Sequence, residues 1–229
     1  MLKTKRNGFT MIELSIGLVF ISILLVAIST TIINVGNSYN RGITLKSISQ
    51  SGRALIADLQ FEIGSVKPFN PIVQGTDYKS INGGTGGRLC LGTYSYIWNY
   101  AIPIEANTLG KNTYTDDVST AIRLVKIADT SQYYCNNPDA TIDKSKAKEL
   151  LKVGDRNIAL YSFDITSPET SYDSVSNSRI YNIEFYLGTS DTKLVRPSTP
   201  YKCNKPGEGV SDYNYCVVEI FSVNILSGG

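Results

Sequence analysis

The chain of 229 residues contains no histidine and has almost no net charge. Without histidine there is no Ser-His or Cys-His catalytic pair, and the commonest protein ligand for zinc is missing. The 22 lysine and arginine residues nearly balance the 20 aspartate and glutamate residues, which gives a formal charge of +2. A balanced chain of this kind carries no strong signal for nucleic-acid binding. These two deficits leave most classes of hydrolase and of nucleic-acid-binding protein without support.

A third deficit is local, because positions 14–40 contain no charged residue. The apolar part of this segment, 14–33, has the length of about 20 residues that is needed to cross the hydrocarbon core of a bilayer. Lys3, Lys5 and Arg6 precede it, so the positive-inside rule predicts a cytoplasmic N-terminus and an external position for the rest of the chain. No Ala-x-Ala site follows the apolar run, so we expect it to be retained as a single-pass anchor.

Glu13 is unusual because it lies directly next to this apolar run. A carboxylate near the centre of a bilayer costs about 2.5 kcal/mol or more, so a buried position implies a positively charged partner. In an ordinary anchor the side chain would instead lie at the interface and reach the water around the lipid headgroups. The residues around Glu13 decide between these two interpretations.

A short basic leader, then Gly8 and Phe9, then Glu13 four residues later and a long apolar helix form a pattern that resembles the class III signal of type IV pilins and pseudopilins. The resemblance implies that a prepilin peptidase cleaves the chain after Gly8 and that the new amine of Phe9 is methylated. It also implies that Glu13 pairs with the amine of another subunit during filament assembly, with Thr10 as an additional hydroxyl donor.

The same resemblance places the protein first in the bacterial cytoplasmic membrane and then in a cell-surface pilus. The implied partners are other pilin subunits, the inner-membrane assembly machinery, the prepilin peptidase and, before assembly, membrane lipid. Residues 51–59 also resemble the equivalent helix of the PilW and J-type group of minor pilins.

Beyond the anchor, apolar and small residues recur at steps of three and four, which indicates an amphipathic helix that ends at Lys67-Pro68. They are Ile48, Gly52, Leu55, Ile56, Leu59, Ile63 and Val66. A continuous helix over 9–66 would be about 87 Å long, which a single domain cannot bury. We therefore expect its first half to be covered by lipid or by neighbouring subunits.

After position 68 the apolar period changes to two, which predicts strands at 89–102, 121–127, 158–165, 180–187 and 216–226. A short helix is predicted at 144–152, capped by Asp143 and ended by Gly154. The expected fold is α+β, with a long N-terminal transmembrane helix packed on an antiparallel sheet in the shape of a lollipop. The predicted parts are a cleaved leader at 1–8, a transmembrane and assembly half of the helix at 9–35, an amphipathic half at 36–67, and an extracytoplasmic β-rich domain at 68–229.

Three sequence patterns have a chemical interpretation that we consider weaker than a structural one. The glycine-rich segment 82–88 lacks the Gly-Lys-Ser/Thr of a phosphate-binding loop and is predicted to be a flexible loop. The alternating aromatic residues Tyr94, Tyr96, Trp98 and Tyr100 are expected to pack in the core rather than to stack on a ligand. Calcium binding would need a denser ligand set than the one formed by Asp116, Asp117, Asp155 and Asp212. No catalytic, cofactor or metal site is predicted, and we do not expect an enzyme.

The four cysteines, Cys90, Cys135, Cys203 and Cys216, contain no Cys-x-x-Cys motif. Outside a membrane two disulfides are the simplest arrangement, and three pairings are possible. We prefer Cys203 with Cys216, which closes a short loop near the C-terminus, and by remainder Cys90 with Cys135. Free buried thiols are the alternative.

Together these features predict a structural subunit, minor or initiating, of a type IV pilus or a related surface filament. The alternatives are the major pilin of such a filament and a pseudopilin of a type II secretion system. A membrane-tethered enzyme would need a catalytic constellation that the sequence does not contain.

Overall fold

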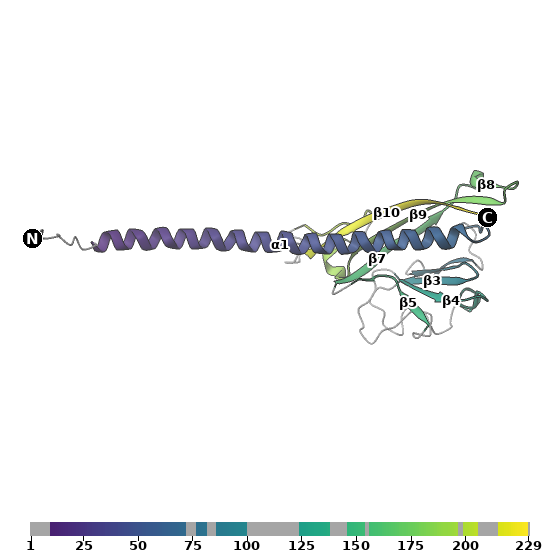
Figure 1. The fold of residues 1–229 in the computed structure, drawn as a ribbon, viewed down its shortest axis with the longest axis horizontal. Coiled ribbons are helices and arrows are strands. Elements are labelled where there is room, and N and C mark those ends of the chain that lie inside the picture. Colours follow the sequence, from purple (N-terminus) through teal and green to yellow (C-terminus); the bar gives the residue numbers. More distant parts are fainter. Residues whose placement is uncertain are drawn as a thin grey trace, which may run out of the picture.

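The structure is a computed structural model that describes residues 10–71, 77–81, 86–99, 124–137, 146–153, 156–196, 199–205 and 215–228. A single helix, α1 (Met11–Gly64), contains 54 residues. Its N-terminal part projects from the molecule as a bare stem, and its C-terminal part lies along a β-rich head (Figure 1). The α+β class and the antiparallel pairing of the strands are therefore as predicted.

Within the described residues the head contains two antiparallel sheets. The first sheet has the order β1 (Tyr78–Ile81), β2 (Gly86–Cys90), β3 (Tyr94–Asn99), β4 (Leu124–Ala128) and β5 (Ala147–Glu149). The second has the order β10 (Val218–Ser227), β9 (Ser178–Thr189), β7 (Arg156–Thr166) and β6 (Lys152–Val153), and β8 (Tyr172–Asp173) pairs with β9. A short helix α2 (Tyr133–Asn136) and two 3-10 turns, η1 (Glu169–Ser171) and η2 (Thr192–Leu194), connect these strands.

The apolar stripe predicted for the second half of α1 is the part of the helix that enters the core. Ile48, Leu59 and Ile63 are completely buried, and Leu55 is nearly so. The helix ends at Gly64, two residues before the predicted end, and beyond it the N–H of Ser65 donates to the carbonyl of Glu62 and the N–H of Val66 to that of Ile63. In Figure 1 the strands β9 and β10 lie on one side of this half of α1, and β3, β4 and β5 lie on the other.

A row of aromatic rings joins the two sheets and the helix in the core. Phe221, Phe185 and Phe163 are register partners on β10, β9 and β7, and consecutive ring centroids are 5.2 and 5.9 Å apart. Trp98 of β3 continues the row, with its ring 4.6 Å from that of Phe163. At the other end, Phe221 lies directly against the backbone of Gly52 in α1. Burial of these large side chains is the main force that holds the sheets to the helix.

The predicted helix at 144–152 is wrong in the part that the structure describes. Residues 147–149 form the edge strand β5, which pairs with Val125–Ile127 of β4, and the N–H of Leu150 donates to the carbonyl of Leu124. Residues 152 and 153 form β6. The helix-favouring composition of this segment is overridden because pairing with β4 satisfies its backbone groups and buries Leu151.

The strand predicted at 89–102 is also corrected, because its described part is a hairpin of β2 and β3. Gly92 has a φ of +84°, which turns the chain between these two strands. The strands predicted at 158–165, 180–187 and 216–226 are confirmed as β7, β9 and β10, with ends that differ by a few residues. Positions 121–123 of the remaining predicted strand lie outside the described residues, and its other part is β4.

Candidate functional site

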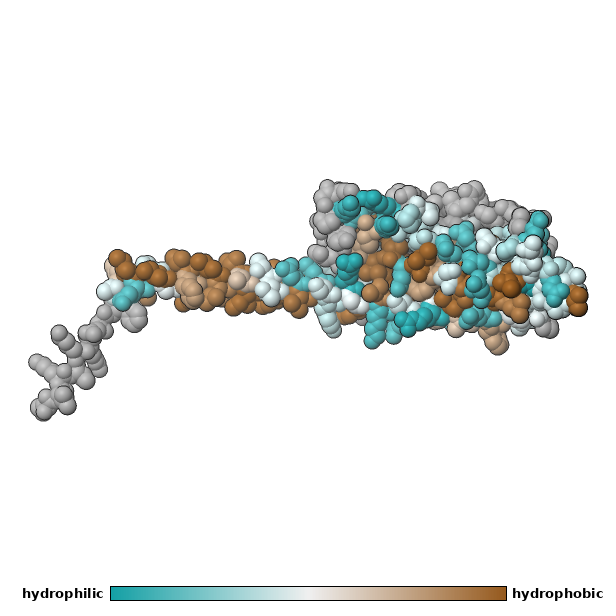
Figure 2. Space-filling model, turned by 90° about the horizontal axis from the view of Figure 1, so that it is seen from above, coloured by the Kyte–Doolittle hydropathy of each residue, from teal (hydrophilic) through white to brown (hydrophobic). Residues whose placement is uncertain are grey.

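The stem of α1 is apolar and uncovered. From Met11 to Val35 its large apolar side chains are between 45 and 92% exposed, and Figure 2 shows them as a continuous hydrophobic surface. Among the described residues, α1 is the one helix long and apolar enough to cross a membrane. An apolar surface of this size is not stable in water, so it requires lipid or protein around it.

The stem begins with a capping box formed by Thr10 and Glu13. The backbone N–H and the hydroxyl of Thr10 donate to Oε2 of Glu13 over 2.9 and 2.8 Å, and the N–H of Glu13 donates to the Thr10 hydroxyl over 3.3 Å. This pair satisfies donors that the first turn of a helix otherwise leaves free. Both bonds to the carboxylate end at Oε2, so Oε1 accepts no hydrogen bond from a described residue.

The direct contact between Thr10 and Glu13 within one chain was missed in the sequence analysis, which assigned both residues only to a contact between subunits. The spacing Thr-x-x-Glu before an apolar run is the sequence signature of a capping box and would have revealed it. The predicted processing residues Gly8 and Phe9 lie outside the described residues.

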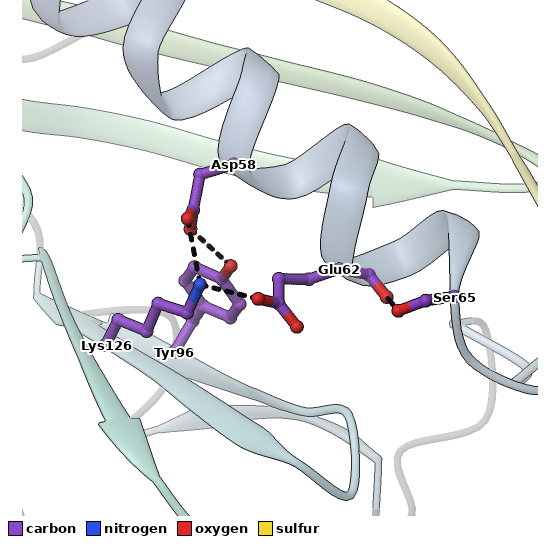
Figure 3. A network of polar contacts seen from close by, with 5 residues as sticks. All are labelled: Asp58, Glu62, Ser65, Tyr96 and Lys126. Carbon is purple, nitrogen blue, oxygen red and sulfur yellow. Dashed lines mark hydrogen bonds and ion pairs between the residues drawn. The ribbon is translucent and has the colours of Figure 1, made fainter.

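A second group of polar side chains connects the buried half of α1 to the first sheet (Figure 3). Asp58 and Glu62 lie one turn apart on α1, and Nζ of Lys126 on β4 is 2.8 Å from a carboxylate oxygen of each. The hydroxyl of Tyr96 on β3 donates to Asp58 over 2.5 Å. Glu62 is buried and Asp58 is half-buried, so the lysine compensates two carboxylates that water does not fully solvate.

The surroundings of Lys126 and Tyr96 favour the protonated form of both side chains. Burial opposes the charge of Lys126, but the hydrogen bonds and negative charges of Asp58 and Glu62 outweigh it and raise the pKa of Lys126. Burial and then the hydrogen bond to Asp58 raise the pKa of the Tyr96 hydroxyl far above its ordinary value. Since both groups keep their protons at neutral pH, the network acts as a fixed link between helix and sheet.

The cysteines form two disulfides, Cys90 with Cys135 and Cys203 with Cys216, which is the preferred pairing. Cys90–Cys135 ties β2 to α2 and spans 45 residues, whereas Cys203–Cys216 spans 13 residues before β10. Cys90, Cys135 and Cys216 are almost completely buried. The disulfides therefore stabilise the head and are not exposed redox centres.

The aromatic residues of β3 pack in the core, as predicted, at the two positions where the structure describes a buried ring. Tyr96 and Trp98 are 0 and 1% exposed. Tyr94 is half-buried and its ring lies 4.4 Å from Nζ of Lys126, which is a cation–π contact. Tyr100 lies outside the described residues. These rings are not available to stack on a ligand.

The glycine-rich segment is corrected in its second part, because residues 86–88 belong to β2. Gly86 and Gly87 lie against the backbone and the ring of Trp98, where a Cβ atom would not fit. Residues 82–85 lie outside the described residues, as do Asp116, Asp117, Asp155 and Asp212. The described residues contain no group of three side chains that could hold a metal ion.

One hollow of about 510 Å³ opens near the C-terminal end of α1. Its wall includes Phe69, Asp77 and Gln132, and Nε2 of Gln132 donates to Asp77 over 2.8 Å. This bond engages one carboxylate oxygen of Asp77, and the wall of the hollow is a mixture of polar and apolar side chains. Comparisons of the chain with protein-family models, with curated proteins and with solved structures find no match.

Proposed function

We propose that the chain is a structural subunit of a type IV pilus or a related surface filament, a minor or initiating subunit rather than the bulk one. The observation that carries the proposal is that the two halves of α1 have different surroundings. Its first half is an uncovered apolar stem, and its second half is part of the core of the head. The class III signal-like residues Gly8 and Phe9 directly precede that helix.

In this proposal the subunit is held in the cytoplasmic membrane by its stem, with the head outside. A prepilin peptidase removes residues 1–8, and the charge count of the mature chain becomes 19 basic against 20 acidic residues, because the leader takes Lys3, Lys5 and Arg6 with it. The stem then leaves the lipid by exchanging it for the stems of neighbouring subunits, so that its apolar surface stays out of water throughout.

Glu13 has a defined part in this exchange. Its Oε2 is bonded by Thr10 of the same chain, whereas Oε1 accepts no bond from a described residue. Oε1 is thus the atom that can receive the amine of Phe9 from an incoming subunit. An ammonium group there would compensate the carboxylate at the point where the apolar environment makes its charge most costly.

Mass spectrometry of filaments sheared from the cell surface tests the function directly. We expect a mature mass that lacks residues 1–8, a methyl group on Phe9, and a low stoichiometry relative to the bulk subunit. Gly8→Val should leave an uncut precursor in the membrane. The absence of the chain from every sheared filament preparation, with normal export of its head, would contradict the proposal.

The role of Glu13 is tested with Glu13→Leu, which should still be cleaved but should enter filaments at a level reduced by about tenfold or more, since one charge pair in apolar surroundings is lost. Glu169→Leu, at an exposed position in the head, is the matched control and should enter normally. Equal incorporation of the two variants would show that Glu13 is a tolerated interfacial residue.

A further inference from the structure

The outward face of the buried half of α1 is exposed and positively charged. Lys46, Gln50, Arg53, Ala57 and Phe61 recur at steps of three, four and seven residues, so they lie on one side of the helix, opposite the core residues. Phe61 is 74% exposed although it is a large apolar side chain. No described residue forms an ion pair with Lys46 or Arg53. We call these five residues the helix face.

The outer surface of the second sheet is also uncovered, except near Tyr186, which packs against Tyr201. Because Phe163, Phe185 and Phe221 point into the core, the residues that alternate with them point outward. They form three rows across β7, β9 and β10: Asp164, Glu184 and Ser222; Thr166, Asn182 and Asn224; and Ile180 with Leu226. We call these rows the sheet face. Ile180 and Leu226 are 47 and 58% exposed.

The first of these rows is electrostatically unfavourable in the isolated head. Asp164 and Glu184 are direct register partners, and two like charges opposite each other destabilise an antiparallel pair. Ser162 donates to Asp164 over 2.6 Å, but no cation among the described residues forms an ion pair with either carboxylate. A basic group supplied from outside would relieve this repulsion.

The helix face and the sheet face carry complementary groups in the same order along the molecule. Within one head, Gly52 lies beside Phe221 and Gly64 beside Leu226, so α1 and β10 run in the same direction. Arg53 is therefore near the level of the acidic row, and Phe61 is near the level of the apolar row. The separation is about 12 Å along the helix from Arg53 to Phe61 and about 14 Å along the sheet between the two rows.

From this match we infer that the helix face of one copy of the chain docks on the sheet face of a second, parallel copy. Arg53 meets Asp164 and Glu184, and Phe61 covers the apolar row. Ala57, which lies between them, is small enough to let the helix approach the sheet. The inference rests on the proposed filament function, because it gives the heads of neighbouring subunits a lateral contact in addition to that of the stems.

The two faces belong to different sides of the head, so the contact is heterologous. Each copy that docks through its helix face leaves its sheet face free for another copy. Such contacts close into a ring or continue as an open helical chain, and a filament requires the second outcome.

The test uses the full chain in lipid vesicles, where the contact can form without assembly machinery. A copy with Phe61→benzoylphenylalanine is reconstituted with a ¹⁵N-labelled copy that lacks the probe, and the sample is irradiated. We expect mixed-isotope links from position 61 to the peptides that contain Ile180 or Leu226. The isotope label is essential, because Leu226 of the same chain lies close to the end of α1 and gives single-isotope links.

A probe at Tyr133, which is exposed on α2, is the control and should not reach these peptides.

Charge reversal provides the second measurement. Arg53→Glu should lower the yield of mixed-isotope links about tenfold, and Arg53→Glu combined with Glu184→Lys should restore much of it. Lys193→Glu, a reversal of an exposed charge outside the helix face, should leave the yield unchanged. The inference is overturned if all links are single-isotope links, or if mixed-isotope links from position 61 are no stronger than those from the Tyr133 probe. It is also overturned if Arg53→Glu leaves the yield of mixed-isotope links unchanged. Presence of the chain in sheared filaments is measured separately, so a failed contact and a failed filament function give different results.

Discussion

At the scale of single residues, Gly52 of α1 lies directly against the ring of Phe221 on β10. A Cβ atom on this residue would overlap the ring of Phe221. Gly52→Ala should therefore lower the free energy of unfolding by about 1 to 3 kcal/mol, although alanine favours the helix by about 1 kcal/mol. Thermal unfolding of the full chain in detergent micelles, followed by circular dichroism, measures the effect.

Gly42→Ala is the matched control, because nothing lies within 4 Å of the added Cβ. It should leave the stability unchanged or raise it by up to about 1 kcal/mol. Equal stability of the Gly52 variant and the unchanged protein would mean that Phe221 can move away without loss.

Lys126 is the residue on which the polar link between α1 and the first sheet depends. Lys126→Met would leave the carboxylates of Asp58 and Glu62 facing each other without a cation, and Glu62 is buried. We expect a loss of about 2 to 3 kcal/mol in the free energy of unfolding, measured by denaturant titration. Adding Glu62→Gln to this variant should recover part of the loss, whereas a further decrease would show that Glu62 is stabilised by something other than the lysine.

The same network predicts a loss of stability in alkali. The pKa values of Tyr96 and Lys126 are raised in the folded protein above their ordinary values of 10.0 and 10.5. A raised pKa stabilises the fold while the group is protonated, so the contribution is complete below about pH 10 and is lost as the pH rises further. The free energy of unfolding, measured between about pH 8 and pH 11, should fall with a slope of up to about 1.4 kcal/mol per pH unit for each group. Tyr96→Phe should reduce that slope, and an unchanged slope would contradict the assignment.

At the scale of elements, the two disulfides differ in the length of chain that they close. The Cys90–Cys135 bridge closes 45 residues and the Cys203–Cys216 bridge closes 13, so the loop-entropy estimate gives about 4 and about 3 kcal/mol. Replacing Cys90 and Cys135 by alanine should therefore destabilise the head more than replacing Cys203 and Cys216. Thermal unfolding of the two double variants gives the order, and the reverse order would show that packing around Cys216 outweighs the loop length.

Elements with a strong internal period, such as α1 and the strands β7, β9 and β10, could be predicted from the sequence, whereas β5 and the turn between β2 and β3 could not. The helix α1 is specified by its own apolar period and by the stop at Pro68, so its ends differ from the prediction by only two residues on each side. Strand β5 is specified by β4, which lies more than twenty positions earlier in the chain, and its own residues favour a helix. Gly92, through its positive φ, divides the single strand predicted at 89–102 into two strands.

The contacts of the candidate site also differ in how well the sequence predicts them, because some are local and others join distant parts of the chain. The importance of Thr10 and Glu13 is visible in four consecutive positions, because a capping box is local. The link of Asp58 and Glu62 to Lys126 joins residues that are 68 and 64 positions apart, so no sequence pattern marks it. The pairing of the cysteines lies between these cases, because loop length limits the choices without fixing one.

At the scale of the whole molecule, the exposed stem and the folded head should be separable. The core of the head takes residues of α1 only from Thr44 onward. A chain that begins at position 36 should therefore be a soluble, folded protein, whereas the full chain should need detergent or lipid to avoid aggregation. Size-exclusion chromatography with light scattering, with and without detergent, tests both statements. A shortened chain that still aggregates would indicate that the head itself has a large adhesive surface.

Because one unbroken helix forms both the stem and part of the core, a mechanical load on the stem is carried into the head along α1. The helix and β10 run side by side, with Ser49 bonded to Glu219, Gly52 against Phe221 and Gly64 beside Leu226. A pull along the axis therefore shears these contacts all at once instead of peeling them apart in sequence. Forced unfolding is governed by the height of the barrier, and a barrier shared by many simultaneous contacts is high. The head is thus joined to its stem by side-by-side contacts that resist shear, as the proposed role in a filament would require.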